Sequence, residues 1–196
     1  REYYENVLEI LKKNVKRTPD DIQALRDLSG TYNNLGFLSD AEGDSKQAKE
    51  YYENALEGFD KIVEQTQDDL EALSDLSGTY NNLGFLSDAE GDSKQAKEYF
   101  EKALEIRKKI VERTPDDIQA LRDLSGTYSS LGVLSDAEGE RKQAREYYEK
   151  ALEGFEKIVE RTPDDPQALQ FLAYLQAQLE EEQPFWRRWF KRLFKR

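Results

Sequence analysis

The sequence repeats itself every 48 residues, and this period limits the folds open to the chain more than any other feature. The stretch DLSGTYNNLGFLSDAEGDSKQAKEYYENALE begins at Asp27 and returns at Asp75 with two substitutions, at Phe100 and Lys102. It returns again, more altered, at Asp123. Repeats of this length are typical of stacked arrays, in which each copy contacts its neighbours.

The copies at the two ends are incomplete. The opening REYYENVLEILKKNVKRTPDD aligns with the second half of a repeat, and PDDPQALQFLAYLQAQLEEEQ aligns with the first half of another. We therefore divide the chain into a half repeat (1–19), three full repeats (20–67, 68–115, 116–163), a second half repeat (164–183) and a separate segment (184–196). Because the chain contains no Met and opens inside a repeat, we expect it to be a piece of a longer one.

Each full repeat contains two amphipathic helical patterns and no strand pattern. In the first repeat, apolar residues from Ile22 to Leu38 recur at steps of three and four, and a second stripe of the same period runs from Ala48 to Val63. These stripes predict helices at about residues 20–42 and 45–65, with ends good to about two residues.

Residues that favour helix ends fall between these patterns. Gly43 suits the left-handed conformation that ends many helices, and Asp44 with Gln47 resembles a capping box at the start of the next. In the last half repeat, we expect Asp165 to cap a helix whose first residue is Pro166.

Eight positions of the first repeat resemble the signature of the tetratricopeptide repeat family: Tyr32, Leu35, Gly36, Gly43, Ala48, Tyr52, Ala55 and Leu56. The spacing recurs in the next two repeats, and the resemblance covers nearly all of residues 1–183. It implies an all-α, right-handed superhelical solenoid of antiparallel helix pairs. The usual repeat has about 34 residues, and the ungapped signature puts the additional ones outside it. About two further turns on each helix keep the apolar stripes in phase, so we expect elongated helices.

Five glycines inside the helical patterns call for an explanation. Gly30, Gly78 and Gly126 lie in the middle of first helices, where glycine is unfavourable, and their recurrence predicts a close approach of helices or a break. Gly58 and Gly154 correspond to Ile106 in the second repeat and Ile10 in the first half repeat, so we expect no steric need for glycine there.

The family resemblance implies a concave groove lined by first helices, and with it a non-catalytic scaffold that binds a peptide or protein segment. The groove positions that carry side chains able to contact a ligand are Asn33, Phe37, Asp40, Asn81, Phe85, Asp88, Ser129, Val133 and Asp136. Helical spacing brings Arg26 and Arg122 toward the same face. Asparagine amides can hold a peptide backbone, phenylalanines supply apolar surface, and the aspartates favour basic or neutral ligands.

Composition argues against several other functions. The chain has no His and no Cys, so common catalytic bases, thiolate nucleophiles and zinc ligands are missing, and we expect neither an enzyme nor a metal or other cofactor. The net charge of −12 disfavours nucleic acid. SDAEGDSKQ lacks the ligand order of a calcium loop. No stretch resembles a signal peptide or a membrane-spanning helix, so we expect a cytoplasmic or membrane-peripheral protein.

The segment 184–196 differs from the acidic repeats. Behind Pro184, an apolar face alternates with a basic face. The apolar face consists of Phe185, Trp186, Trp189, Phe190, Leu193 and Phe194. The basic face consists of Arg187, Arg188, Lys191, Arg192, Lys195 and Arg196.

Three roles for this segment compete. Counting 48 residues forward from Arg141, the next second helix begins near Trp189, so the segment is in place to cap the array. It can instead lie on an anionic membrane, which would make the protein a peripheral membrane adaptor, or fill a partner's groove or that of a neighbouring copy. Self-association through the segment or the array ends stays open, as does an engineered, consensus-like array with a structural role only.

Overall fold

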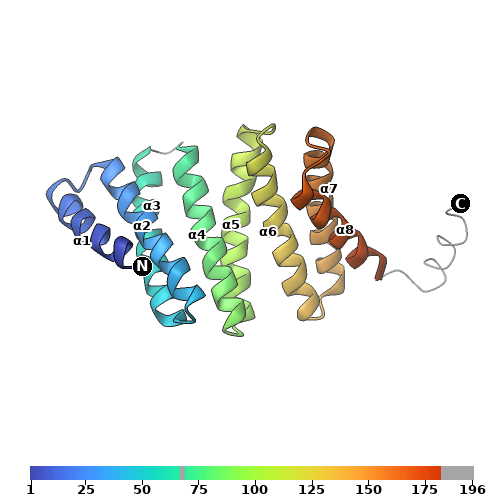
Figure 1. Cartoon of the computed structure of the whole chain (residues 1–196). Coiled ribbons are helices and arrows are strands. Elements are labelled where there is room, and N and C mark those ends of the chain that lie inside the picture. Colours follow the sequence, from blue (N-terminus) through green and yellow to red (C-terminus); the bar gives the residue numbers. More distant parts are fainter. Residues whose placement is uncertain (67–68, 182–196) are drawn as a thin grey trace, which may run out of the picture. The chain divides into compact units, whose positions relative to one another are not determined.

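The computed structural model describes residues 1–66 and 69–181, and within these ranges the chain is helical and contains no strand (Figure 1). The C-terminal segment 184–196, with its predicted apolar and basic faces, lies outside the described residues. The described helices are α1 (Glu2–Arg17), α2 (Ile22–Ala41), α3 (Ser45–Thr66), α4 (Leu70–Ala89), α5 (Ser93–Arg113), α6 (Ile118–Ala137), α7 (Arg141–Arg161) and α8 (Pro166–Glu181).

The helices form antiparallel pairs, as predicted. The first helices α2, α4 and α6 begin 48 residues apart, as do the second helices α3, α5 and α7. In the first repeat the observed bounds lie within two residues of the predicted ones. The described repeats contain no third helix, so the additional residues lengthen the two helices.

The chain divides into two compact parts, an N-terminal part Arg1–Ile110 and a C-terminal part that begins at Val111. In the N-terminal part, α2 packs against α1, α3 and α4, and α3 also contacts α4. In the C-terminal part, α7 contacts both α6 and α8. Figure 1 shows α2 and α4 on the near side of the first part with α3 behind them. First helices thus share one side of their part.

The predicted helix ends are largely confirmed. Gly43 has a φ of +81°, and the main-chain N–H of Gln47 donates to Asp44 Oδ1 at 3.1 Å. The reciprocal half of the capping box is missing, because the Gln47 side chain donates to Glu50 instead. Asp165 caps α8 by accepting from the main-chain N–H groups of residues 167 and 168, and Pro166 is the first helical residue.

The core lies between the paired helices. On α3 it consists of Ala48, Tyr52, Ala55, Phe59 and Ile62, all at most 2% exposed, and α7 repeats this set. On α5 the place of Phe59 is taken by Arg107, which is 9% exposed. Its guanidinium donates from Nε to Ser77 Oγ at 3.3 Å and from Nη1 to Asn81 Oδ1 at 3.2 Å. The sequence analysis missed this buried cation.

One glycine in each first helix receives an aromatic ring. A Cβ atom on Gly36 would lie 2.6 Å from the Tyr52 ring, and the same distance separates Gly84 from Phe100 and Gly132 from Tyr148. Any larger residue would push the helices apart. We call this feature the glycine notch.

Two explanations were predicted for Gly30, Gly78 and Gly126, a close approach of helices and a helix break, and both are wrong. The first helices run through these positions without a break, and no atom lies within 4 Å of a Cβ built there. The three glycines face open space at half-exposed positions.

The expectation for Gly58 and Gly154 holds only where the facing serine changes its conformation. A Cβ on Gly58 would lie 1.9 Å from the hydroxyl of Ser29, which donates to the Leu25 carbonyl. In the second repeat, where Ile106 replaces the glycine, the Ser77 hydroxyl donates to a carbonyl three residues back instead of four. The Ser77 hydroxyl therefore points in another direction than the Ser29 hydroxyl. Whether a residue larger than glycine fits depends on the rotamer of the facing serine.

Gly30→Ala should raise the free energy of unfolding by about 0.5–1 kcal/mol, because alanine forms helix better and the methyl group meets nothing. The matched Gly36→Ala should lower it by about 1–3 kcal/mol, because the added carbon overlaps the Tyr52 ring. Urea unfolding followed by circular dichroism compares both with the parent chain. Changes of the same sign in both variants would contradict the notch.

Candidate functional site

A strip of exposed and half-exposed positions runs along the first helices of the N-terminal part. On α2 it consists of Gly30, Asn34, Phe37 and Ala41, which are spaced to lie on one side of a helix, and on α4 of Gly78, Asn82, Phe85 and Ala89. We call this strip the first-helix face. Its largest side chains are Phe37, 62% exposed, and Phe85, 50% exposed.

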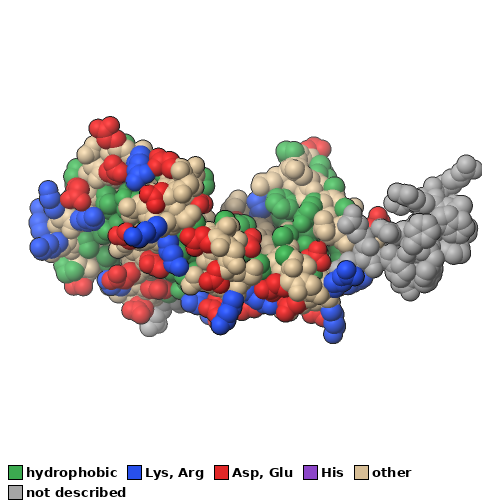
Figure 2. Space-filling view, turned by 90° about the horizontal axis from the view of Figure 1, so that it is seen from below, with side chains coloured by type: hydrophobic (Ala, Val, Ile, Leu, Met, Phe, Trp, Pro, Cys, Tyr) green, Lys and Arg blue, Asp and Glu red, His purple; other side chains and the backbone are tan. Residues whose placement is uncertain are grey.

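The predicted apolar and acidic residues are at the surface. Phe37 and Phe85 lie one turn from the exposed Asp40 and Asp88. In the C-terminal part, Val133 is 44% exposed and Asp136 is exposed as well. Figure 2 shows acidic side chains spread over both parts, with lysines and arginines among them.

The predicted asparagines are partly used inside the fold. The Asn33 side-chain oxygen accepts from Thr79 Oγ1 and Asn82 Nδ2, both at 3.3 Å, and so links α2 to α4. Asn81 Oδ1 accepts from Arg107. Ser129 is only 4% exposed, so its hydroxyl is not presented at the surface.

The structure presents Asn34 on this face, a residue that the sequence analysis did not select. The family pattern pointed to Asn33, one position earlier. Helical spacing from Gly30 and Phe37 alone would have found Asn34, because residues four and seven apart share a side.

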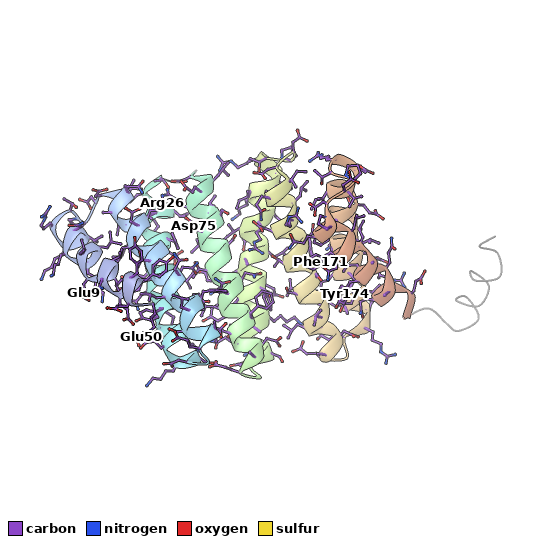
Figure 3. All side chains as sticks on the ribbon, viewed as in Figure 1. Glu9, Arg26, Glu50, Asp75, Phe171 and Tyr174 are labelled. Atoms are coloured by element: carbon purple, nitrogen blue, oxygen red, sulfur yellow. The ribbon has the colours of Figure 1, made fainter. Side chains whose placement is uncertain are left out.

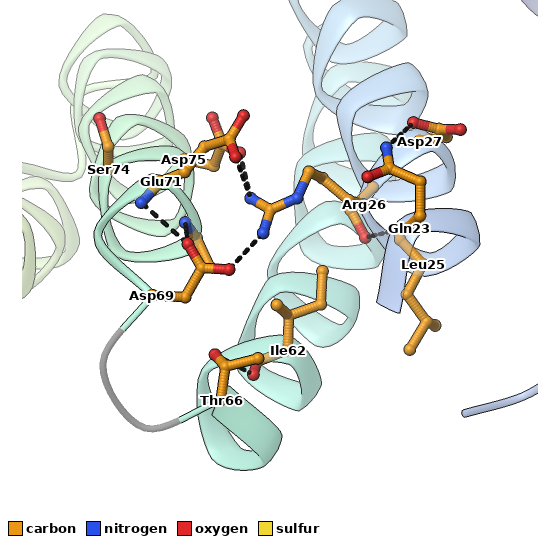
Figure 4. A network of polar contacts seen from close by, with 12 residues as sticks. Gln23, Leu25, Arg26, Asp27, Ile62, Thr66, Asp69, Glu71, Ser74 and Asp75 are labelled. Atoms are coloured by element: carbon orange, nitrogen blue, oxygen red, sulfur yellow. Dashed lines mark hydrogen bonds and ion pairs between the residues drawn. The ribbon is translucent and has the colours of Figure 1, made fainter. Parts of the chain in front are cut away.

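Helical spacing predicted that Arg26 faces the groove, but its side chain forms ion pairs with carboxylates of the next repeat (Figure 4). Its side chain is 13% exposed and pairs with Asp69, and at longer range with Glu71 at 3.4 Å and Asp75 at 3.6 Å. Asp69 in turn caps α4 by accepting from the main-chain N–H groups of residues 71 and 72. The Arg26 guanidinium is therefore surrounded by carboxylates from the N-terminal end of α4, although its buried Nη1 has only the two longer ion pairs and no hydrogen bond.

Arg122 repeats this arrangement in the C-terminal part. Its Nη2 lies 2.5 Å from Asp165 Oδ2 and its Nη1 donates to Gln167 at 3.2 Å. Asp165 is the cap of α8. We use the name arginine latch for each of these two pairs, Arg26 with Asp69 and Arg122 with Asp165.

The latch carboxylates have shifted pKa values. The pKa of Asp69 is lowered chiefly by the main-chain N–H of Ala72, with Arg26 as a further cause. The pKa of Asp165 is lowered chiefly by the hydrogen bond from Arg122. Burial raises the pKa of Asp75, and Arg26 partly offsets that.

The described residues limit the chemistry of the site. Within residues 1–66 and 69–181, no group of three or more acidic, His or Cys side chains is arranged to hold a metal ion. Over the same ranges, no helix is long and apolar enough to cross a membrane. The first-helix face offers aromatic rings, amides and carboxylates, which are groups suited to contact with another chain.

Arg26→Gln should raise the pKa of Asp69, and Arg122→Gln should raise the pKa of Asp165, because each arginine is among the causes that lower the pKa of its partner. Both aspartates have a lower pKa in the folded chain than in the unfolded chain. The stability that they contribute is therefore present above the unfolded pKa and is lost as the pH falls through the folded pKa. Carboxyl ¹³C titration of both aspartates measures the two shifts. An unchanged pKa of either aspartate in its variant would contradict the assigned cause.

Comparison with known proteins agrees with the helical pairing. Family models described as tetratricopeptide repeat match residues 29–57, 77–110 and 124–167, which together make up more than half of the chain. No curated protein matched the sequence.

Solved structures with a similar fold come from several sources. A designed helical repeat protein is 20% identical with a TM-score of 0.53, covering 92% of this chain and 90% of its own. A thermophilic TPR protein of Thermus thermophilus is 24% identical with a TM-score of 0.51, covering 90% of each chain. BtubC (BKLC) of P. vanneervenii is 19% identical with a TM-score of 0.52, covering 92% of this chain and 76% of its own. With the matched family models, the paired helices and the recurring signature, this chain belongs to the tetratricopeptide repeat family.

Proposed function

We propose that the chain is a non-catalytic scaffold that binds a peptide or protein segment along the first-helix face. Tetratricopeptide repeats generally mediate protein–protein interactions. The observation that carries the proposal for this chain is the pair Phe37 and Phe85, two large aromatic side chains left half or more exposed at equivalent places on neighbouring helices.

The energetics favour an apolar contact at these two rings. Completing the burial of a large apolar side chain stabilises a contact by up to about 1.5–3 kcal/mol, and a ring that is half exposed has part of that still to gain. Phe85 is already held in place, because its ring packs edge-on against the buried Phe100 ring at 5.1 Å. A ring that is positioned before binding loses little entropy when a ligand covers it.

The charge of the first-helix face and its two glycines indicate which kind of peptide fits it best. Asp40 and Asp88 beside the phenylalanines are acidic, and the whole chain carries −12, so a basic segment is favoured. Gly30 and Gly78 are not needed for packing inside the fold. Because they have no side chain, the helix backbone is accessible between the larger side chains. A ligand backbone can approach the helices closely there. The ligand that fits best is a basic segment with large apolar side chains.

Selection from a displayed peptide library tests this proposal. Peptides rich in Lys and Arg with at least one large apolar residue are expected to bind the intact chain. The double variant Phe37→Ala with Phe85→Ala should weaken their binding about tenfold or more, equivalent to about 1.4 kcal/mol. Isothermal titration calorimetry measures the loss.

The matched control is Tyr3→Ala with Ile10→Ala. These side chains are 73% and 60% exposed but lie on α1, outside the first-helix face. Their removal should leave binding unchanged. Failure to select any binder, or a loss of binding in the control alone, would contradict the proposal.

A further inference from the structure

α8 carries an apolar face that is only partly covered among the described residues. Its leucines Leu169, Leu172 and Leu179 stand at the positions of Leu25, Leu28 and Leu35, 144 residues earlier, which is three repeats. In the first repeat α3 covers that side of α2, and Leu25 is 5% and Leu35 0% exposed. On α8, Leu169 is 44% exposed and the other two are half-buried. We call these three residues the leucine face.

The leucine face adjoins the side of α8 that packs on α7. On that side, the Phe171 ring stacks on Phe155 at 4.7 Å, the Tyr174 ring meets Tyr148 edge-on at 6.5 Å, and Leu175 is fully buried (Figure 3). α8 is thus held firmly by α7 and still offers the side on which a second helix would pack.

Glu180 restricts what can cover this face. It stands at the position of Gly36, Gly84 and Gly132, so the glycine notch is filled. A second helix of the repeat type places an aromatic ring there, and a Cβ at this position already overlaps that ring. The α1 helix of a second copy, with Tyr4 at the position of Tyr52, is excluded in this register for the same reason. The partner must bring a cation or a small residue to Glu180 instead.

The segment that follows α8 in the sequence meets this requirement. The segment begins four residues after Glu181, the last described residue of α8, so it lies next to the leucine face in the sequence. We propose that residues 185–196 of the same chain pack as a short helix, antiparallel to α8, on the leucine face. In that arrangement the arginines and lysines of the segment can pair with Glu180.

The dimensions agree with this arrangement. Twelve helical residues span about 18 Å, whereas the path from Leu179 to Leu172 is about 10 Å. A helix of this length can therefore cover both Leu179 and Leu172, and Leu169 lies at the far edge of the contact. The apolar residues of the segment cover the leucines while its cations face Glu180 and solvent. The acidic end of α8 and the basic segment are thus complementary in charge.

Intrinsic fluorescence tests the proposal directly, because the chain has two tryptophans, Trp186 and Trp189, and both lie in this segment. In dilute solution of the full chain, we expect emission at a shorter wavelength than that of free indole and weak quenching by acrylamide. The double variant Leu172→Gln with Leu179→Gln should move the emission to longer wavelength and raise the quenching constant. Glu180→Lys should act in the same direction, more strongly at low salt.

The matched control is Tyr3→Gln with Ile10→Gln, which removes exposed apolar side chains from α1 and should leave both signals unchanged. Circular dichroism of each variant checks that the repeats remain folded. Emission of fully exposed indole in the parent chain, or no response to the leucine substitutions, would overturn the proposal. So would protection that appears only at high protein concentration, which indicates a second copy, or only with anionic vesicles, which indicates a membrane.

Discussion

The packing of an aromatic ring into the glycine notch is the contact on which each repeat depends. A ring from the second helix occupies the space of the missing Cβ on Gly36, Gly84 or Gly132, and this fixes how closely the two helices approach. The same contact sets the rotation of the first helix about its axis. Gly36 faces inward, so Gly30, Asn34 and Phe37 must face outward. The fold and the candidate binding face are therefore set by one residue.

The terminal half repeat shows what happens when this contact is given up. In α8, Phe171, Tyr174 and Leu175 stand where earlier first helices have Asp, Gly and Thr. These larger side chains strengthen the contact with α7, the helix on which α8 packs. Glu180 then removes the notch that another repeat would need. α8 therefore differs from α2, α4 and α6, each of which receives an aromatic ring at this position.

The sequence alone predicted the helices, their pairing and their ends, because these depend on local periodicity and capping. It did not predict which glycines are sterically required. Gly30 and Gly58 both lie inside helices, and only the position of the facing helix distinguishes open space from the hydroxyl of Ser29.

The candidate site was predicted less completely than the fold. Phe37 and Phe85 are exposed as expected, since side-chain direction follows from helical spacing. Arg26 and Asn33 are engaged by α4, and such partners lie about one repeat away in sequence, beyond the reach of local pattern. Arg107 was missed for the same reason, because its polar partners lie on another helix.

The arginine latches have a consequence for how the array unfolds. Arg26 couples two repeats within the N-terminal part and Arg122 couples two within the C-terminal part, whereas the equivalent residue of the second repeat is Ser74, whose hydroxyl carries no charge. In a linear array, stability is the sum of the intrinsic terms of each repeat and the terms between nearest neighbours. Each latch therefore adds an ionic contribution to the neighbour term within its own part. A loss of order in one of the two helices that it joins also removes a stabilising contact from the other.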